Sequence, residues 1–305
     1  MSTALHTILE NFQQRRPLRA GSLIITIYGD ALMPRGGEVW LGSLINVLEP
    51  FGLNPRLTRT AVFRLTQDDW LQAKPIGRRS YYQVTESGRT SFTQAFKRIY
   101  ASASPDWHGE WTVAMLSMLD NDERRLLRQK LSWLGFGQVG PQTMMHPSAN
   151  VTDVEKILRN NDLQDKVMLI HGLNNGDKVT PAMLDQIKTC WDLESLGQDY
   201  QMFLDMFQPL LHELNDCSIN DEQAFQARTL LIHEYRRIML KDPFLPDELL
   251  CANWNGRAAR QLCANLYQQL WQAAERYISS QLETADGPLP AANQKFLRRF
   301  GGLQK

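Results

Sequence analysis

The sequence predicts a multidomain α+β fold, with a first segment of helices and a ribbon, a middle segment of alternating strands and helices, and a last segment of helices alone. Three observations predict it. The chain has 305 residues, enough for two or three compact domains. After residue 104 strand-like runs begin to alternate with helical ones. From about Pro181 onward no strand pattern is left. We therefore expect domains at 1–104, 105–180 and 181–305.

The first segment contains a predicted third helix whose start is marked by two residues. Asn54 suits the N-cap position, and Pro55 suits the first helical position, where the lost N–H needs no partner. In order, we expect helical segments at 22–29, 40–51 and 55–69, strands at 70–74 and 80–84, and a linker helix that opens at Thr85 and Glu86. Three helices followed by a two-stranded ribbon are the order of a winged helix-turn-helix.

The middle segment predicts an α/β sandwich. We expect strand 111–119, helix 122–134, a glycine-rich turn at 135–140 leading into a strand, helix 151–160 and strand 166–173. This order suggests a ferredoxin-like sandwich of about 80 residues. The last segment predicts an all-α C-terminal domain, broken at Asp242-Pro243 and Asn255-Gly256, with helices near 182–194, 198–213, 221–241 and 257–282.

The formal net charge of zero hides an asymmetry along the chain. Residues 1–100 contain 13 Lys and Arg against 7 Asp and Glu, so the remainder is acidic. This distribution predicts a polyanion partner for the first third of the chain. No apolar run approaches the roughly 20 residues of a membrane span, and the N-terminus lacks the apolar core of a signal peptide. With 4 cysteines in no CxxC spacing, we expect reduced thiols, a cytoplasmic location and no membrane partner.

The predicted helix from Pro55 has two unlike faces. On a helical wheel, Leu57, Ala61 and Leu65 cluster on one side. Candidate DNA contacts gather on the other side: Arg56, Arg59, Thr60, Phe63, Arg64 and Gln67. An α-helix fits the major groove, where Arg pairs bidentately with guanine and Gln with adenine. Phe63 is unusual on a polar face, and it either meets a thymine methyl group or packs beneath the ribbon.

The ribbon that follows adds three further candidate DNA contacts, Lys74, Arg78 and Arg79. Cations at this position suit phosphates or the minor groove. A solvated basic face on a helical bundle is the alternative interpretation, but a basic ribbon directly after a basic helix favours DNA. One helix in one groove covers only a half-site, so we expect a homodimer on double-stranded operator DNA.

Seven sequence blocks spread over the whole chain resemble the phenylacetic acid degradation repressor (PaaX) family. They are YGDALMPRGGEVWLGSL (28–44), RTAVFRL (59–65), IGRRSYY (76–82), WLGFG (133–137), LLIHEYRRIMLKDPFLPDELL (230–250), RQLCANLYQ (260–268) and RFGG (299–302). The resemblance implies a winged-helix first domain, a central domain similar to the small CRISPR-associated Cas2 fold that pairs two copies, and a helical C-terminal domain. It also implies repression of genes for aerobic phenylacetate breakdown, relieved by phenylacetyl-coenzyme A as effector, with no cofactor.

A coenzyme A thioester needs cations for its phosphates and an apolar slot for its phenyl ring. The last segment offers both residue types around the Asp-Pro break. Candidate effector contacts are His233, Tyr235, Arg236, Arg237, Lys241, Trp254, Arg257 and Arg260. Aromatic and basic residues on amphipathic helices also serve core and surface, which is the alternative for each of them.

Two enzymatic alternatives remain open. The Cas2 resemblance makes Asp120 a candidate metal ligand of a nuclease, but Mg²⁺ takes several oxygens and no second acid is obvious nearby, so a helix cap at Asp120 or Asn121 is favoured. The second alternative is an enzyme that acts on acyl-coenzyme A thioesters. No GxSxG is present, and HEYRR at 233–237 is not HExxH because Arg237 replaces the second histidine. We expect no catalytic or metal-binding residue, and a hydrogen-bonded, half-buried His233.

Overall fold

A computed structural model describes residues 2–101, 107–173 and 179–304. These residues pack as two compact units. The first unit comprises residues 1–102, 201–239 and 257–305, and the second comprises 103–200 and 240–256. Helices of the predicted C-terminal domain are therefore shared between the units, and most of them pack with the N-terminal segment. The division near 104 and 180 stays a prediction about sequence segments, and the first of these boundaries lies outside the described residues.

The N-terminal part of the first unit is mainly helical. Its elements are α1 (Thr3–Gln13), α2 (Ala20–Ile27), a π turn (Tyr28–Leu32), a 3-10 turn (Met33–Arg35), β1 (Glu38–Trp40), α3 (Leu41–Leu48), a 3-10 turn (Glu49–Phe51) and α4 (Pro55–Gln67). The predicted start of α4 is confirmed, since the Asn54 side chain accepts a hydrogen bond from the Leu57 amide at 2.9 Å. Neither α1 nor β1 is among the elements predicted from the sequence. Leu5, Ile8 and Phe12 form a buried stripe at helical spacing on α1.

The predicted ribbon is a hairpin of β2 (Leu71–Ile76) and β3 (Arg79–Val84). Gly77 allows the tight turn between them because its φ is +59°. β1 pairs antiparallel with β3, so the sheet order is β1-β3-β2. The linker helix α5 (Glu86–Ile99) follows, with the Thr85 hydroxyl accepting a hydrogen bond from the Gly88 amide at 3.0 Å. The strands and the helix start expected here are confirmed.

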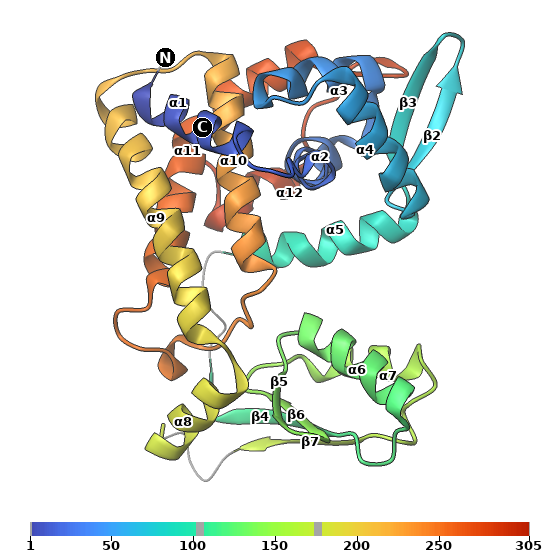
Figure 1. Ribbon diagram of the computed structural model, residues 1–305, viewed down its shortest axis with the longest axis vertical. Helices are drawn as coiled ribbons and strands as arrows, with labels where there is room; N and C mark the ends of the chain where they lie inside the picture. Colours follow the sequence, from blue (N-terminus) through green and yellow to red (C-terminus); the bar gives the residue numbers. More distant parts are fainter. Residues whose placement is uncertain (1, 102–106, 174–178, 305) are drawn as a thin grey trace. The chain divides into compact units, whose positions relative to one another are not determined.

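The later helices close the first unit around α2. They are α10 (Asp221–Met239), α12 (Gln294–Leu297) and the parts of α9 (Leu193–Asp216) and α11 (Asn255–Gln281) that belong to this unit. α2 lies between α4 and α10 and packs against both (Figure 1). Residues 224–235 of α10 are all buried, so its polar side chains need partners inside the protein. A hairpin of β8 (Glu283–Thr284) and β9 (Gly287–Pro288) shows that the expectation of an all-α segment was not complete.

The second unit contains a four-stranded antiparallel sheet with two of its helices packed on one face (Figure 1). Its elements are β4 (Glu110–Met115), α6 (Asn121–Trp133), β5 (Gly137–Gly140), β6 (Thr143–His146), α7 (Val151–Arg159), β7 (Met168–Leu173), α8 (Pro181–Cys190) and a 3-10 turn (Asp247–Leu249). The order β-α-β-β-α-β with the sheet order β5-β6-β4-β7 is the ferredoxin-like arrangement that the sequence predicts.

Two expectations for the second unit were wrong in detail. The glycine-rich segment at 135–140 is itself partly a strand, β5, which pairs with β6. The strand expected at 111–119 ends at Met115, since the chain turns where the Leu119 amide bonds to the Leu116 carbonyl at 3.3 Å. Leu116 and Leu119 are nonetheless buried, and this explains why the apolar run resembles a longer strand. The apolar run here correctly predicts that its side chains are buried, but the strand ends earlier because the backbone turns after Met115.

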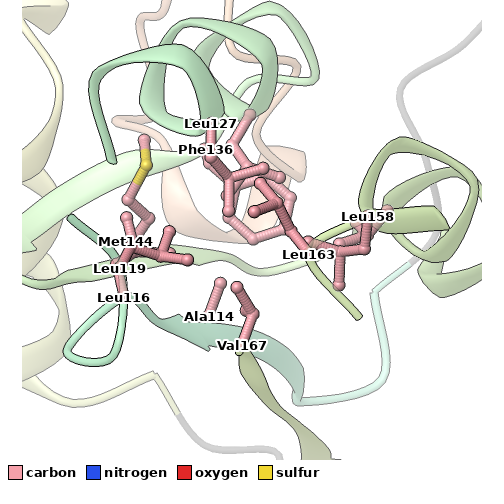
Figure 2. Close-up of a cluster of buried hydrophobic side chains, with 11 residues drawn as sticks. Ala114, Leu116, Leu119, Leu127, Phe136, Met144, Leu158, Leu163 and Val167 are labelled. Atoms are coloured by element: carbon pink, nitrogen blue, oxygen red, sulfur yellow. The ribbon is translucent and has the colours of Figure 1, made fainter. Parts of the chain in front are cut away.

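One core cluster joins the sheet of the second unit to α6 and α7. Figure 2 shows its side chains pointing toward one another, and they include Ala114, Leu116, Leu119, Leu127, Phe136, Met144, Leu158, Leu163 and Val167. A second cluster, which includes Trp107, Met145, Ile187, Trp191, Leu245 and Leu249, lies around α8. Both clusters remove apolar surface from water, which is the main favourable contribution to folding.

Candidate functional site

The two predicted faces of α4 are confirmed as buried and exposed faces. Thr58, Ala61, Val62 and Leu65 are buried. All six candidate DNA contacts on the helix are exposed: Arg56, Arg59, Thr60, Phe63, Arg64 and Gln67. The alternative that Phe63 packs beneath the ribbon is wrong, because 63% of this residue is exposed. The ring is therefore available for contact with a partner.

The arginines of α4 have free guanidinium groups. Arg56, Arg59 and Arg64 form no ion pair with any residue that the structure describes. Thr60 is held by the helix itself, since its hydroxyl donates to the Arg56 carbonyl at 2.9 Å. Each guanidinium presents five N–H donors in a planar fork, which suits guanine edges and phosphates. A helix of 13 residues is about 20 Å long, enough to lie along a major groove.

The hairpin cations differ from one another. Lys74 forms an ion pair with Glu38 at 3.2 Å, and Arg79 forms one with Glu283 at 2.9 Å. Arg79 also lies over the ring of Trp40, with 4.2 Å between the guanidinium carbon and the ring centroid. Arg78 is exposed at the turn and has no ion pair within the described chain. Of the three predicted hairpin contacts, Arg78 is therefore the one whose charge is not already engaged.

A buried cluster of charged side chains stabilises the end of α2. Asp30, in the π turn after α2, accepts hydrogen bonds from Arg228 Nε at 2.8 Å and from Arg299 Nη1 at 2.8 Å. The hydroxyls of Tyr100 and Tyr267 donate to the same carboxylate at 2.7 and 2.9 Å. Burial raises the pKa of Asp30, but the two guanidinium groups and the two hydroxyls outweigh it and hold the pKa below its usual value.

Two further residues complete this cluster, which we call the Asp30 network. Glu275 accepts from Arg228 Nη1 at 2.8 Å and pairs with the guanidinium of Arg35. The network joins the two turns that follow α2, the residue after α5, α10, α11 and the C-terminal 3-10 turn (Arg299–Gly301) within the first unit. The local sequence patterns do not reveal this network, although Asp30 and Arg299 fall inside the blocks 28–44 and 299–302, and Arg228 lies two residues before the block 230–250. The only available signal was the presence of charged residues in otherwise apolar helices.

His233 is hydrogen-bonded as predicted, but it is buried rather than half-buried. Its Nδ1 lies 3.0 Å from the hydroxyl of Thr26, which itself donates to the Ser22 carbonyl at 3.0 Å. Nδ1 must therefore be the donor in the contact with Thr26. Burial, followed by the charges of Arg236, Arg237 and Arg15, lowers the pKa of His233 to about 3. The ring is neutral at physiological pH, far from the value that suits a general base there.

The structure brings together only some of the candidate effector contacts. His233, Arg236 and Arg237 lie near one another at the end of α10, whereas the buried Tyr235 packs against Phe203 with 5.5 Å between ring centroids. Arg257 and Arg260 are half-buried on α11 in the same unit.

Lys241 and Trp254 belong to the second unit. There, Lys241 pairs with Asp199 at 2.7 Å and lines a recess of about 180 Å³, while the Trp254 ring lies 5.8 Å from Tyr200. This volume is below the roughly 300 Å³ of a pocket for a drug-sized ligand.

Asp120 caps α6, which confirms the favoured interpretation of this residue. Its carboxylate accepts from the amides of Asp122 and Glu123 at 2.9 Å each, and Glu123 accepts from the Asp120 amide at 3.1 Å. This reciprocal arrangement is a capping box. Across the described residues no group of three or more His, Cys, Asp or Glu side chains is placed to hold a metal ion. Both amides bond to Oδ1 of Asp120, so this oxygen is engaged by the helix start.

Family models match three consecutive segments of the chain. A PaaX-like protein model matches residues 19–88, a PaaX protein central Cas2-like domain model matches 104–184, and a PaaX-like protein C-terminal domain model matches 191–280. The chain is also 38% identical over 301 residues to the transcriptional repressor PaaX of Escherichia coli strain K12, covering 98% of this chain and 95% of that protein. The chain belongs to the PaaX family.

The candidate DNA contacts and the candidate effector contacts fall in segments that match different PaaX-family models. The segment 19–88 holds α4 and the hairpin, and 191–280 holds α10 and every candidate effector contact.

A solved structure of an uncharacterized protein from Mycobacterium tuberculosis is 20% identical to this chain, with a TM-score of 0.49, and the match covers 76% of this chain and 88% of that one. Among the described helices none is long and apolar enough to cross a membrane.

Proposed function

We propose that this protein is a cytoplasmic transcriptional repressor of phenylacetate catabolic genes, which binds double-stranded operator DNA as a homodimer and is released by phenylacetyl-coenzyme A. The observation that carries the proposal is the exposed basic face of α4 next to the exposed hairpin, in a chain whose PaaX relative is a transcriptional repressor. The candidate contacts of α4 share one face, and their guanidinium groups are not used within the described fold.

In this proposal the segment from α2 to β3 acts as a winged helix-turn-helix. Its order of helices, with β1 added to the edge of the hairpin sheet, agrees with that motif. α4 takes the position of the recognition helix in the major groove, where Arg59 reads a guanine and Phe63 meets a thymine methyl group. Arg78 at the hairpin turn contacts phosphate. This division assigns specificity to the helix and general affinity to the hairpin.

Dimerisation is assigned to the sheet of the second unit. Met115 on β4 lies directly opposite Met168 on β7, and Val113 lies opposite Ile170, so the four side chains share one face. Met115, Met168 and Ile170 are 37%, 62% and 50% exposed. An exposed apolar patch beside an edge strand favours a second copy of the chain. Met168→Glu should turn a dimer into a monomer in light scattering, and an unchanged mass would exclude this face.

The proposal includes no catalysis and no cofactor. His233 is buried and neutral, and the Asp120 carboxylate caps α6. The effector acts through binding energy alone: it releases DNA only if it binds the DNA-free conformation more tightly. The expected coupling is about 1–3 kcal/mol, or roughly 5–150-fold in affinity. Operator DNA must then weaken effector binding by the same factor.

A mobility shift on DNA upstream of the phenylacetate catabolic genes, titrated with phenylacetyl-coenzyme A, tests the proposal. We expect a specific complex that the thioester dissociates, while free coenzyme A and phenylacetate do not. A complex that resists the thioester would remove the effector from the proposal. Failure to bind this DNA more tightly than an unrelated sequence would remove the repressor function.

A further inference from the structure

Arginines from two distant segments meet beside the start of α2. Arg15, in the loop after α1, donates to Glu234 Oε1 at 2.6 Å, and Arg237 donates to Glu234 Oε2 at 2.9 Å. Arg236, directly before Arg237 on α10, donates to the Ser22 hydroxyl at 3.4 Å. We call Arg15, Arg236 and Arg237 the arginine cluster. Arg15 and Arg237 share the Glu234 carboxylate, and Arg236 pairs with no carboxylate within the described chain.

Arg236 is the member whose charge is not balanced. It forms no ion pair within the described chain, and its Nε is buried and has no hydrogen-bond partner there. Burial lowers the pKa of Arg236 to about 10, so the group stays charged at physiological pH. The residue as a whole is half-buried. A partly desolvated cation without a counter-ion is costly, and a buried donor without an acceptor adds to that cost. An anion beside Arg236 would relieve both.

The surroundings of the cluster favour an anion further. His233, which the three arginines surround, is neutral and adds no repulsion among them. Arg16 and Arg19 are exposed in the same loop. The N-terminus of α2, an eight-residue helix, has no side-chain cap within the described chain, and beside Gly21 nothing lies within 4 Å of the place a Cβ would occupy. The amides of Ala20 and Ser22 already donate to the carbonyls of Leu18 and Arg19, so the helix start offers an anion the open space beside Gly21 and the positive end of the helix dipole. Open space with guanidinium groups around it suits a phosphate group.

We propose that the arginine cluster and the N-terminus of α2 bind a phosphate group of a small phosphorylated ligand. If the proposed function holds, this ligand is the effector, and the cluster takes the nucleotide end of its coenzyme A moiety. The position of the cluster also allows ligand binding to affect the DNA-binding helix α4. Ser22 and Thr26, the partners of Arg236 and His233, lie on α2, and α2 packs against α4 (Figure 1). Binding at the cluster therefore acts on the helix that supports α4.

Calorimetry on the full-length protein tests the site with three probes: phenylacetyl-coenzyme A, its pantetheine thioester without the nucleotide, and adenosine 3′,5′-bisphosphate, the nucleotide end alone. The variants are Arg236→Gln and Arg15→Gln, each with a thermal unfolding curve. Arg159→Gln is the matched control, since it removes an exposed arginine that pairs with one carboxylate, Glu155. We expect both cluster variants to lose about tenfold or more in affinity for the two phosphorylated probes. Their affinity for the pantetheine thioester should not change.

The outcomes separate this site from the proposed function. If phenylacetyl-coenzyme A binds and releases DNA equally in wild type and both cluster variants, the function stands and the phosphate site is wrong. If wild type binds only the bisphosphate, and both variants lose it, the site stands without that effector. If the variants lose operator affinity in the absence of any ligand, and the salt dependence flattens, the cluster contacts DNA phosphates and the proposal is overturned.

Discussion

Two groups of arginines in the first unit have opposite surroundings. Arg228 and Arg299 are fully buried and both bond to Asp30, whereas Arg56, Arg59 and Arg64 on α4 are exposed and form no ion pair with the described residues. Removing a guanidinium from water is tolerated only beside a counter-charge. The buried guanidinium groups therefore depend on Asp30 in the folded protein, and the exposed ones stay available to a partner.

Not all of the positive charge in the first 100 residues is available to a partner. The 13 basic residues among the first 100 include Arg35, which is buried against Glu275. Arg79 and Lys74 are exposed but already paired. The charge that attracts a polyanion is therefore smaller than the sequence indicates, and the exposed share that remains includes the three arginines of α4 and Arg78.

Asp30→Ala should lower the free energy of unfolding by about 3–5 kcal/mol, because it leaves two buried guanidinium groups without their carboxylate. Urea denaturation measures this value. Asp153→Ala is the control, since Asp153 is exposed and its pair with Lys156 is 3.9 Å long, and it should cost about 1 kcal/mol or less. Equal small losses in both variants would contradict a stabilising role for the Asp30 network.

The buried His233 should make stability fall with decreasing pH. Its pKa is about 3 in the folded chain and 6.5 ordinarily, so between these values the unfolded chain binds a proton that the folded chain does not. The contribution is complete above pH 6.5 and is lost progressively toward pH 3, with a slope of about 1.4 kcal/mol per pH unit. Unfolding free energies from pH 7 to pH 4 should show a shallower slope for His233→Gln. His6→Gln, at an exposed histidine, should keep the wild-type slope.

Arg59→Ala should lower specific operator affinity by about 1–3 kcal/mol and relax preference at one base pair, because an exposed arginine on α4 is placed to read a guanine. Fluorescence anisotropy on the operator and its single-base variants measures both effects. The unfolding free energy should not change. Unaltered binding by Arg59→Ala would mean that α4 presents another face to DNA.

Arg78→Ala should weaken binding to all DNA sequences similarly and reduce the salt slope by about 1. Arg79→Ala should have a smaller effect, since Arg79 is already engaged by Glu283 and Trp40. Titrations at several salt concentrations, on operator and unrelated DNA, compare the two variants. A larger loss of DNA affinity for Arg79→Ala than for Arg78→Ala would show that the ion pair with Glu283 does not make the Arg79 guanidinium less available to DNA.

Much of the local structure could be predicted from the sequence by itself. The cap and proline at the start of α4, its two faces, the β2–β3 hairpin, the Asp120 cap and the helices after residue 181 all follow from residues near one another in the chain. Such signals are local because helix caps and turns depend on bonds between close neighbours. The family also follows from sequence, since its blocks extend over the chain.

The tertiary structure alone decided which charges are buried and which candidate residues meet. Asp30 and Arg228 are 198 positions apart, and no local pattern links them. Tyr235 and Arg236 are neighbours on α10, yet one packs in the core and the other faces the start of α2. Residues next to each other on a helix point about 100° apart, so their partners depend on the elements packed around the helix. Those elements come from distant parts of the chain, and only the folded protein brings them together.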